Sequence, residues 1–130
     1  MSLQTIDQGI ATRIGHYADA VVIPAGYDQI LVSATPGIDH DGDISADITR
    51  QTEQAWENVT KILDAAGATV TDIVSVRHWL TKESDIGSAL AVRTRYISHR
   101  PASTVAVARE LEHAEFLVTL EVVAARPAVD

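Results

Sequence analysis

Glu121 is the carboxylate whose neighbours in the sequence best suit chemistry. It lies between Thr119 and Val123 on one face of an alternating, largely apolar run over residues 116–125. A carboxylate on a strand face that packs against another surface loses hydration, and such groups are candidates for general acid or base work. The alternative is a rim glutamate, solvated or paired with an arginine across an interface. The sequence leaves both roles open, with the structural one ahead.

Other chemical motifs are few. The five histidines show no HxH or HxxxH spacing, so no zinc site is expected. Asp39, Asp41 and Asp43 alternate like the start of a calcium loop, but the twelve-residue pattern that ends in glutamate is absent, which favours a flexible acidic loop. The GxxxxGK[ST], GxGxxG and GxSxG patterns are also absent. We therefore expect no metal, no cofactor and no serine nucleophile.

Length and charge limit the function classes. A chain of 130 residues predicts one domain over residues 1–130. It has no cysteine, no apolar run of the roughly 20 residues that a membrane helix needs and no signal-peptide pattern, which fits a cytoplasmic protein away from membranes. The net charge of −8 disfavours nucleic acid. The arginines of one stretch are interpreted as a solvated helix face: Arg93, Arg95, Arg100 and Arg109.

The pattern of apolar residues predicts an α+β fold in the order ββαβαββ. Helices are expected over about residues 47–66, where apolar residues recur at spacings of three, four and seven, and from about 81–85 to 98. Ser45 or Asp47 caps the first, and Gly67 fits the position after its end. Strands are expected over residues 20–23, 29–34, 73–80, 104–108 and 116–125, the first two joined by the turn at 24–28.

Two helices cover only one face of a five-strand mixed sheet. Along residues 116–125 both faces are largely apolar, so the uncovered face would expose several hundred Å² of apolar surface. Monomers rarely tolerate such a patch, and association of subunits is the simplest cover.

Several segments resemble the RidA/YjgF family, also called the L-PSP endoribonuclease family, in the right order along nearly the whole chain. Residues 15–20 resemble the family's Gly-Pro-Tyr-Ser-Gln-Ala, and residues 47–67 follow its first helix closely. Further matches are Val32-Ser33-Ala34 to Val-Ser-Gly, Leu80-Thr81 to Leu-Thr, Arg100-Pro101-Ala102 to Arg-Pro-Ala, and Leu120-Glu121-Val122 to the final Ile-Glu-Ala strand.

The resemblance implies a homotrimer with a fold like trimeric chorismate mutase, in which three sheets meet centrally and small-molecule clefts lie between subunits. The family's best-known activity is hydrolysis of enamines and imines such as 2-aminoacrylate, in which an arginine clamps the substrate carboxylate. Carried over to this chain, Glu121 positions water as the catalytic residue. The implied substrate-binding residues are Tyr17, Ser33, Ala34, Ser103, Thr104 and Val105.

Ser103 is a departure, because it stands where the family's deaminases have the clamping arginine. Leu90 also replaces a cleft asparagine. Arg77 or Arg109 could substitute for the missing guanidinium, or Ser103 and Thr104 could bind a neutral or smaller polar ligand, or only satisfy backbone groups. We therefore expect a subgroup that lacks this arginine and uses 2-aminoacrylate poorly.

Three functions follow from this interpretation. The first is a hydrolase or deaminase that acts on the C–N bond of an enamine or imine, the second a metabolite-binding trimer without turnover, and the third an endoribonuclease. The acidic charge weighs against the third. Whether the protein is an enzyme at all stays open at this point.

Overall fold

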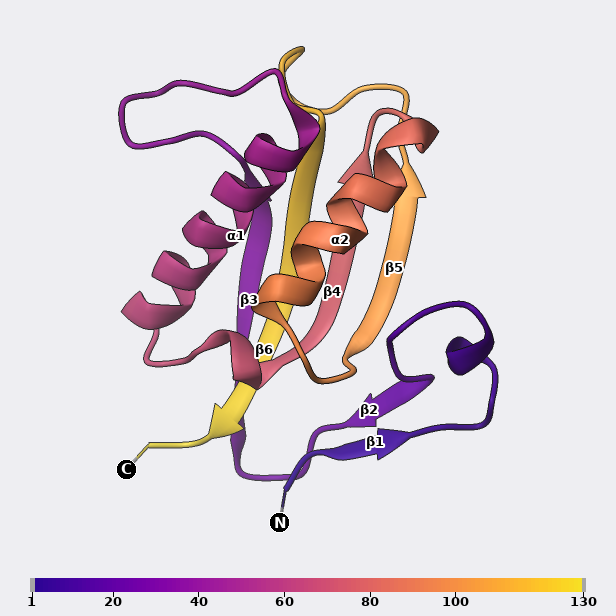
Figure 1. Ribbon diagram of the computed structural model, residues 1–130. Helices are drawn as coiled ribbons and strands as arrows, with labels where there is room; N and C mark the ends of the chain where they lie inside the picture. The colour runs from indigo at the N-terminus through magenta and orange to yellow at the C-terminus, as the bar shows by residue number, and fades with distance from the viewer. Residues whose placement is uncertain (1, 130) are drawn as a thin grey trace.

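The computed structural model describes residues 2–129. Two helices and six strands follow one another along the chain (Figure 1). The strands are β1 (Gln4–Ile6), β2 (Ala20–Val22), β3 (Tyr27–Pro36), β4 (Ile73–Leu80), β5 (Ala102–Val107) and β6 (Val118–Pro127), and the helices are α1 (Ile48–Ala65) and α2 (Ile86–Tyr96). The predicted α+β class and the ββαβαββ order are confirmed, with β1 as an addition. None of the helices described is long and apolar enough to cross a membrane.

The main sheet has four strands in the order β3-β6-β4-β5. Only β4 and β5 run parallel, so the sheet is mixed as predicted. The expected five-strand sheet was wrong in one respect. Residues 20–22 do not join β3 but pair with β1 in a separate antiparallel ribbon. These three residues obtain their hydrogen bonds from β1, a partner too short to be predicted from its own pattern.

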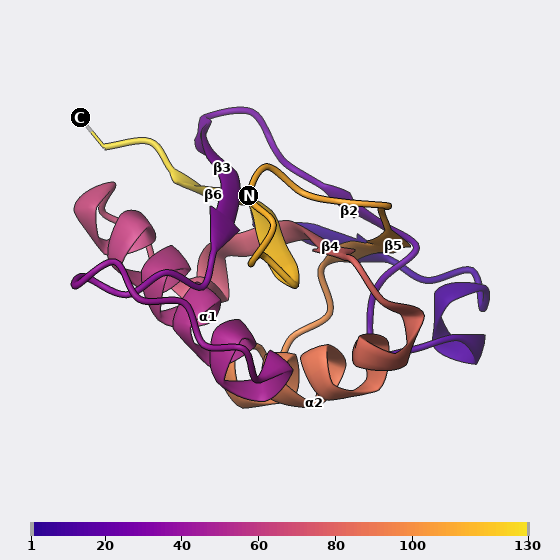
Figure 2. The ribbon, with the colours of Figure 1, turned by 90° about the horizontal axis from the view of Figure 1, so that it is seen from above.

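Both helices pack on the same face of the sheet, as Figure 2 shows from above. The Asp47 side chain caps α1 by accepting from the amide of Arg50 at 3.0 Å, and Gly67 follows the helix with a φ of 76°. The core between the helices and the sheet contains Trp56, Val59, Leu63, Val76, Leu80, Ala89, Val92, Val118, Leu120 and Val122.

No helix within residues 2–129 covers the other face of the main sheet. Along β6 the side chains alternate, so that Leu120 and Val122 face the helices while Glu121 and Val123 face away. Leu31, opposite Val123 on β3, is 76% exposed. We call this side the open face; it is uncovered as the sequence predicts, and it carries the charged Glu121 as well as the apolar Leu31 and Val123.

Candidate functional site

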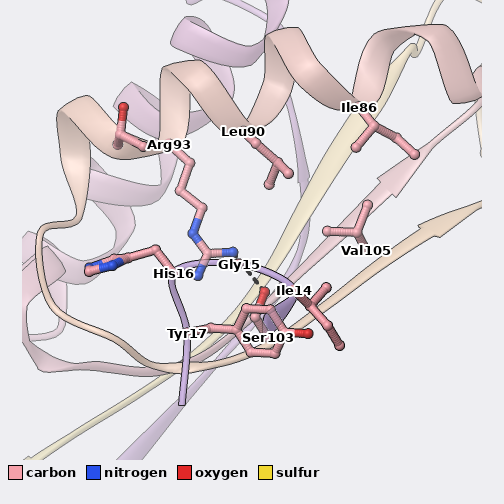
Figure 3. Close-up of a pocket in the computed structure, with 10 residues that line it drawn as sticks. Ile14, Gly15, His16, Tyr17, Ile86, Leu90, Arg93, Ser103 and Val105 are labelled. Atoms are coloured by element: carbon pink, nitrogen blue, oxygen red, sulfur yellow. Dashed lines mark hydrogen bonds between the residues drawn. The ribbon is translucent and has the colours of Figure 1, made fainter. Parts of the chain in front are cut away.

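A pocket of about 510 Å³ lies between α2, β5 and the loop that precedes β2. Figure 3 shows side chains from all three elements that point into it. Its wall consists of Ile14, Gly15, His16, Tyr17, Ile86, Leu90, Arg93, Thr94, Ser103 and Val105. The volume is that of a small-molecule site, and most of the side chains are apolar.

Arg93 is the charged group of this pocket. Its side chain leaves α2 toward β5, and Nη1 donates a 2.7 Å hydrogen bond to Oγ of Ser103 (Figure 3). Arg93 is only 7% exposed, and its buried Nη2 has no hydrogen-bond partner among residues 2–129. Desolvation lowers the pKa of the guanidinium, and Tyr17 opposes that shift. The interpretation of this arginine as part of a solvated helix face is therefore wrong.

Helical periodicity explains why Arg93 is buried. It follows Ala89 by four positions and stands next to Val92, and these three residues form the buried side of α2. Arg95 lies outside that stripe and pairs with Glu53 at 2.8 Å. A helical-wheel projection of α2 places Arg93 on the buried side of the helix, but the charge of its side chain led to the expectation that it is exposed to solvent.

Tyr17 and Val105 enter the same pocket as Ser103. Ser103 and Val105 are two positions apart on β5, so both side chains are on the helix side of the strand. The segment that carries Tyr17 is held beside the start of β5, because the Ala18 amide donates to the carbonyl of Pro101 at 3.0 Å.

Asp19, the next residue, ties this end of the loop to its beginning. Its carboxylate accepts from the amides of Gln8 and Ala11 at 2.5 and 2.7 Å, and these two bonds lower its pKa.

Glu121 lies on the open face and does not line the pocket. Its Oε1 accepts from Nε1 of Trp79 at 3.0 Å, and its Oε2 is 3.5 Å from Nη1 of Arg77. Both partners belong to the neighbouring strand β4, where Arg77 is directly opposite Glu121. The arginine partner therefore lies on the same chain and not, as the structural alternative expected, across an interface.

Thr104 is on the open face as well. It is paired with Arg77 in the register of β4 and β5, and its neighbours Ser103 and Val105 face the helices. The predicted binding residues of β5 are thus divided between the two faces of the sheet.

Ser33 and Ala34 lie on the far edge strand, β3. They fall where the register with β6 shifts between Val32 and Thr35, and the hydroxyl of Thr35 donates to the carbonyl of Ser33 at 2.8 Å. Two strands, β6 and β4, separate β3 from β5 (Figure 1). Within one chain these two residues do not approach the pocket.

Neither arginine considered as a substitute reaches Ser103. Arg77 is bound to Glu121, and Arg109 lines a shallower hollow of about 300 Å³ with Lys82 and Phe116. Leu90, which replaces a cleft asparagine in the family resemblance, forms part of the pocket wall.

Asp39, Asp41 and Asp43 come together, with one oxygen of each within 4.8 Å of the others. One carboxylate oxygen of Asp39 accepts from the amides of Asp41 and Asp43 at 3.0 and 2.8 Å. This geometry is that of a side chain that closes its own turn.

A family model described as endoribonuclease L-PSP matches residues 10–126. The chain belongs to this family, the RidA/YjgF family. A RutC family protein of Pyrococcus horikoshii is 30% identical over 112 residues, which are 85% of this chain and 87% of that protein.

Solved RidA/YjgF-type structures share the fold. The Rid protein YyfB of Yersinia pestis, described as of unknown function, aligns with a TM-score of 0.82 over 97% of this chain and 100% of its own, at 21% identity. TdcF of Escherichia coli, solved with bound serine, gives a TM-score of 0.73 over 87% of this chain and 90% of its own, at 24% identity. At these identities the comparison concerns the fold alone.

Proposed function

We propose that this RidA/YjgF protein is a homotrimer with small-molecule clefts between subunits, and that it hydrolyses or deaminates an enamine- or imine-type metabolite other than 2-aminoacrylate. The observation that carries the proposal is the division of the site residues between two surfaces. Tyr17 and Ser103 line the pocket on the helix side, and Glu121 is on the open face.

A second copy would bring the two surfaces together. β5 is the edge strand that separates the pocket from the open face, so the open face of one subunit could close the pocket of the next. This arrangement would place Glu121, Ser33 and Ala34 beside another subunit's Tyr17. It would also cover Leu31, a large apolar side chain that is 76% exposed in one chain.

Glu121 suits the task of positioning a water molecule. Trp79 and Arg77 hold both carboxylate oxygens from one side, which fixes the direction in which the remaining lone pairs point. In the proposed reaction, water held by Glu121 adds to the carbon of the C=N group. The resulting carbinolamine then expels ammonia and leaves a carbonyl compound.

The pocket favours a larger substrate than 2-aminoacrylate. Its walls include Ile86, Leu90 and Val105, which suit a substrate with an apolar chain longer than that of a three-carbon acid. TdcF, which has the same fold, was solved with bound serine, and this supports the proposal that the ligand is a small molecule. Endoribonuclease action is not proposed, because a net charge of −8 opposes RNA.

The second candidate is a metabolite-binding trimer without turnover. The pair of Arg77 with Glu121 favours it, because a glutamate in an ion pair can be purely structural. Ammonia release from a panel of imines separates the two candidates when it is measured for Glu121→Gln. Glu53→Gln is the matched control, because the Glu53 carboxylate is also paired with an arginine, Arg95, but lies in the helix layer.

For an enzyme, we expect Glu121→Gln to remain trimeric and to lose about 10²–10⁴-fold in turnover, while Glu53→Gln stays active. Ammonia release by Glu121→Gln at the wild-type rate, together with a lower melting temperature, would refute the catalytic role.

A further inference from the structure

We propose that Arg93 and Ser103 together form the receptor for a carboxylate, so that the ligand of this cleft is a small carboxylate with an apolar chain. The inference rests on the proposed function for the location of the cleft. It assigns the guanidinium to α2 instead of β5.

Arg93 is a buried charge without a counter-ion in the described part of the chain. Arg93 is 7% exposed, and the pocket wall around it contains no aspartate or glutamate among residues 2–129. Arg95 and Arg100, the other arginines of this region, have carboxylate partners at 2.8 and 2.6 Å. A desolvated cation is costly unless an anion accompanies it, so the pocket favours an anionic ligand.

Arg93 and Ser103 both keep hydrogen-bond donors that the described chain does not use. A guanidinium has five N–H donors, and Nη2 of Arg93 has no partner in the described chain. Ser103 uses its oxygen to accept from Nη1, which leaves its hydroxyl hydrogen free to donate. A carboxylate that entered here would accept from two adjacent donor groups.

The apolar part of the pocket wall indicates the chemistry of the rest of the ligand. Ile14, Ile86, Leu90 and Val105 surround the approach to the two polar residues (Figure 3). Apolar walls with one fixed polar end favour a ligand that is itself divided, with a charged head and a hydrocarbon tail.

Arg93 could instead pair with a carboxylate of a second subunit. That arrangement makes Arg93 a structural residue and predicts that no small anion competes for it. The experiment below therefore includes the assembly state.

The test is a calorimetric or NMR titration of the whole protein with butyrate and with butyramide, which has nearly the same shape and no charge. We expect butyrate to bind at least about tenfold more tightly than butyramide. Arg93→Gln should abolish this preference, and Arg95→Gln, on the exposed side of the same helix, should retain it. Ser103→Asp should abolish butyrate binding and raise the melting temperature, because the new carboxylate pairs with Arg93.

Butyrate has no C–N bond, so its binding does not need turnover. A failure of hydrolysis therefore leaves this inference intact. Equal affinity of the wild type for both probes, no butyrate binding up to tens of millimolar, or an unchanged preference in Arg93→Gln would overturn it. The inference is equally overturned if Arg93→Gln only dissociates the trimer and the wild type does not bind butyrate.

Discussion

Arg93 on α2 and Ser103 on β5 meet on the helix side of the sheet, with Nη1 of the arginine 2.7 Å from Oγ of the serine. Ser103 stands at the position where the resemblance to the RidA/YjgF deaminases places an arginine. The cleft therefore retains a guanidinium, which approaches from the helix instead of the strand. A neutral ligand bound by Ser103 and Thr104 together does not fit this arrangement, because their side chains lie on opposite faces of β5.

The first prediction is that Ser103→Arg does not restore a deaminase of the usual kind. The new guanidinium would lie beside that of Arg93, which is almost fully buried, and the two like charges would repel each other. We expect a lower melting temperature and no gain in ammonia release from 2-aminoacrylate. The double variant Ser103→Arg/Arg93→Leu is the control, and it should regain stability. A gain of activity in the single variant would show that Arg93 does not occupy the binding position.

The second prediction concerns assembly. Light scattering should give three times the subunit mass of 14.0 kDa. Leu31→Lys places a charge on the open face, on its edge strand β3, and should shift the protein toward monomers. Ile62→Lys is the matched control, since Ile62 is a large exposed apolar residue of α1, on the other side of the sheet. A wild-type mass of one subunit at micromolar concentration would refute the assembly.

The third prediction is a loss of stability in acid that is due to His78. This side chain is buried against Trp56 near Arg93, and burial, followed by the charge of Arg93, lowers its pKa to about 3. Between pH 6.5, the ordinary value, and about 3 the unfolded chain binds the proton and the folded chain does not. The free energy of unfolding should therefore fall by up to roughly 1.4 kcal/mol per pH unit below that ordinary value.

Chemical denaturation at several pH values checks the role of His78. His78→Phe should flatten the acid side of the profile, and His40→Gln, at an exposed histidine, should not. Equal slopes for the wild type and His78→Phe would contradict the assignment.

The sequence predicts the fold well where its periodicity is long. The helix expected over residues 47–66 forms at Ile48–Ala65, and the strand expected over residues 73–80 has those bounds. β2 was predicted as a strand, but β1 and its pairing with β2 were missed, because a three-residue strand such as β1 has no measurable period.

The site was harder to predict than the fold. Ser103 and Tyr17 were identified, but Arg93 was not, because a charged residue within a helix is usually solvated. Ser103 and Glu121 lie on different faces of the sheet because of the register of β5 and β6 against β4. The alternation of residues within a single strand does not predict that register.

If each cleft takes its pocket from one subunit and its glutamate from another, as proposed, mixed trimers of two inactive variants should regain activity. Leu90→Trp projects an indole into the pocket, where it should obstruct the substrate, and Glu121→Gln removes the carboxylate, so each variant alone should be inactive. After co-refolding in equal amounts, with mixed trimers verified by mass spectrometry, about one quarter of the clefts should combine an intact pocket with an intact glutamate. We expect the mixture to recover about one quarter of the wild-type ammonia release. Mixed trimers that stay as inactive as their parents would contradict it.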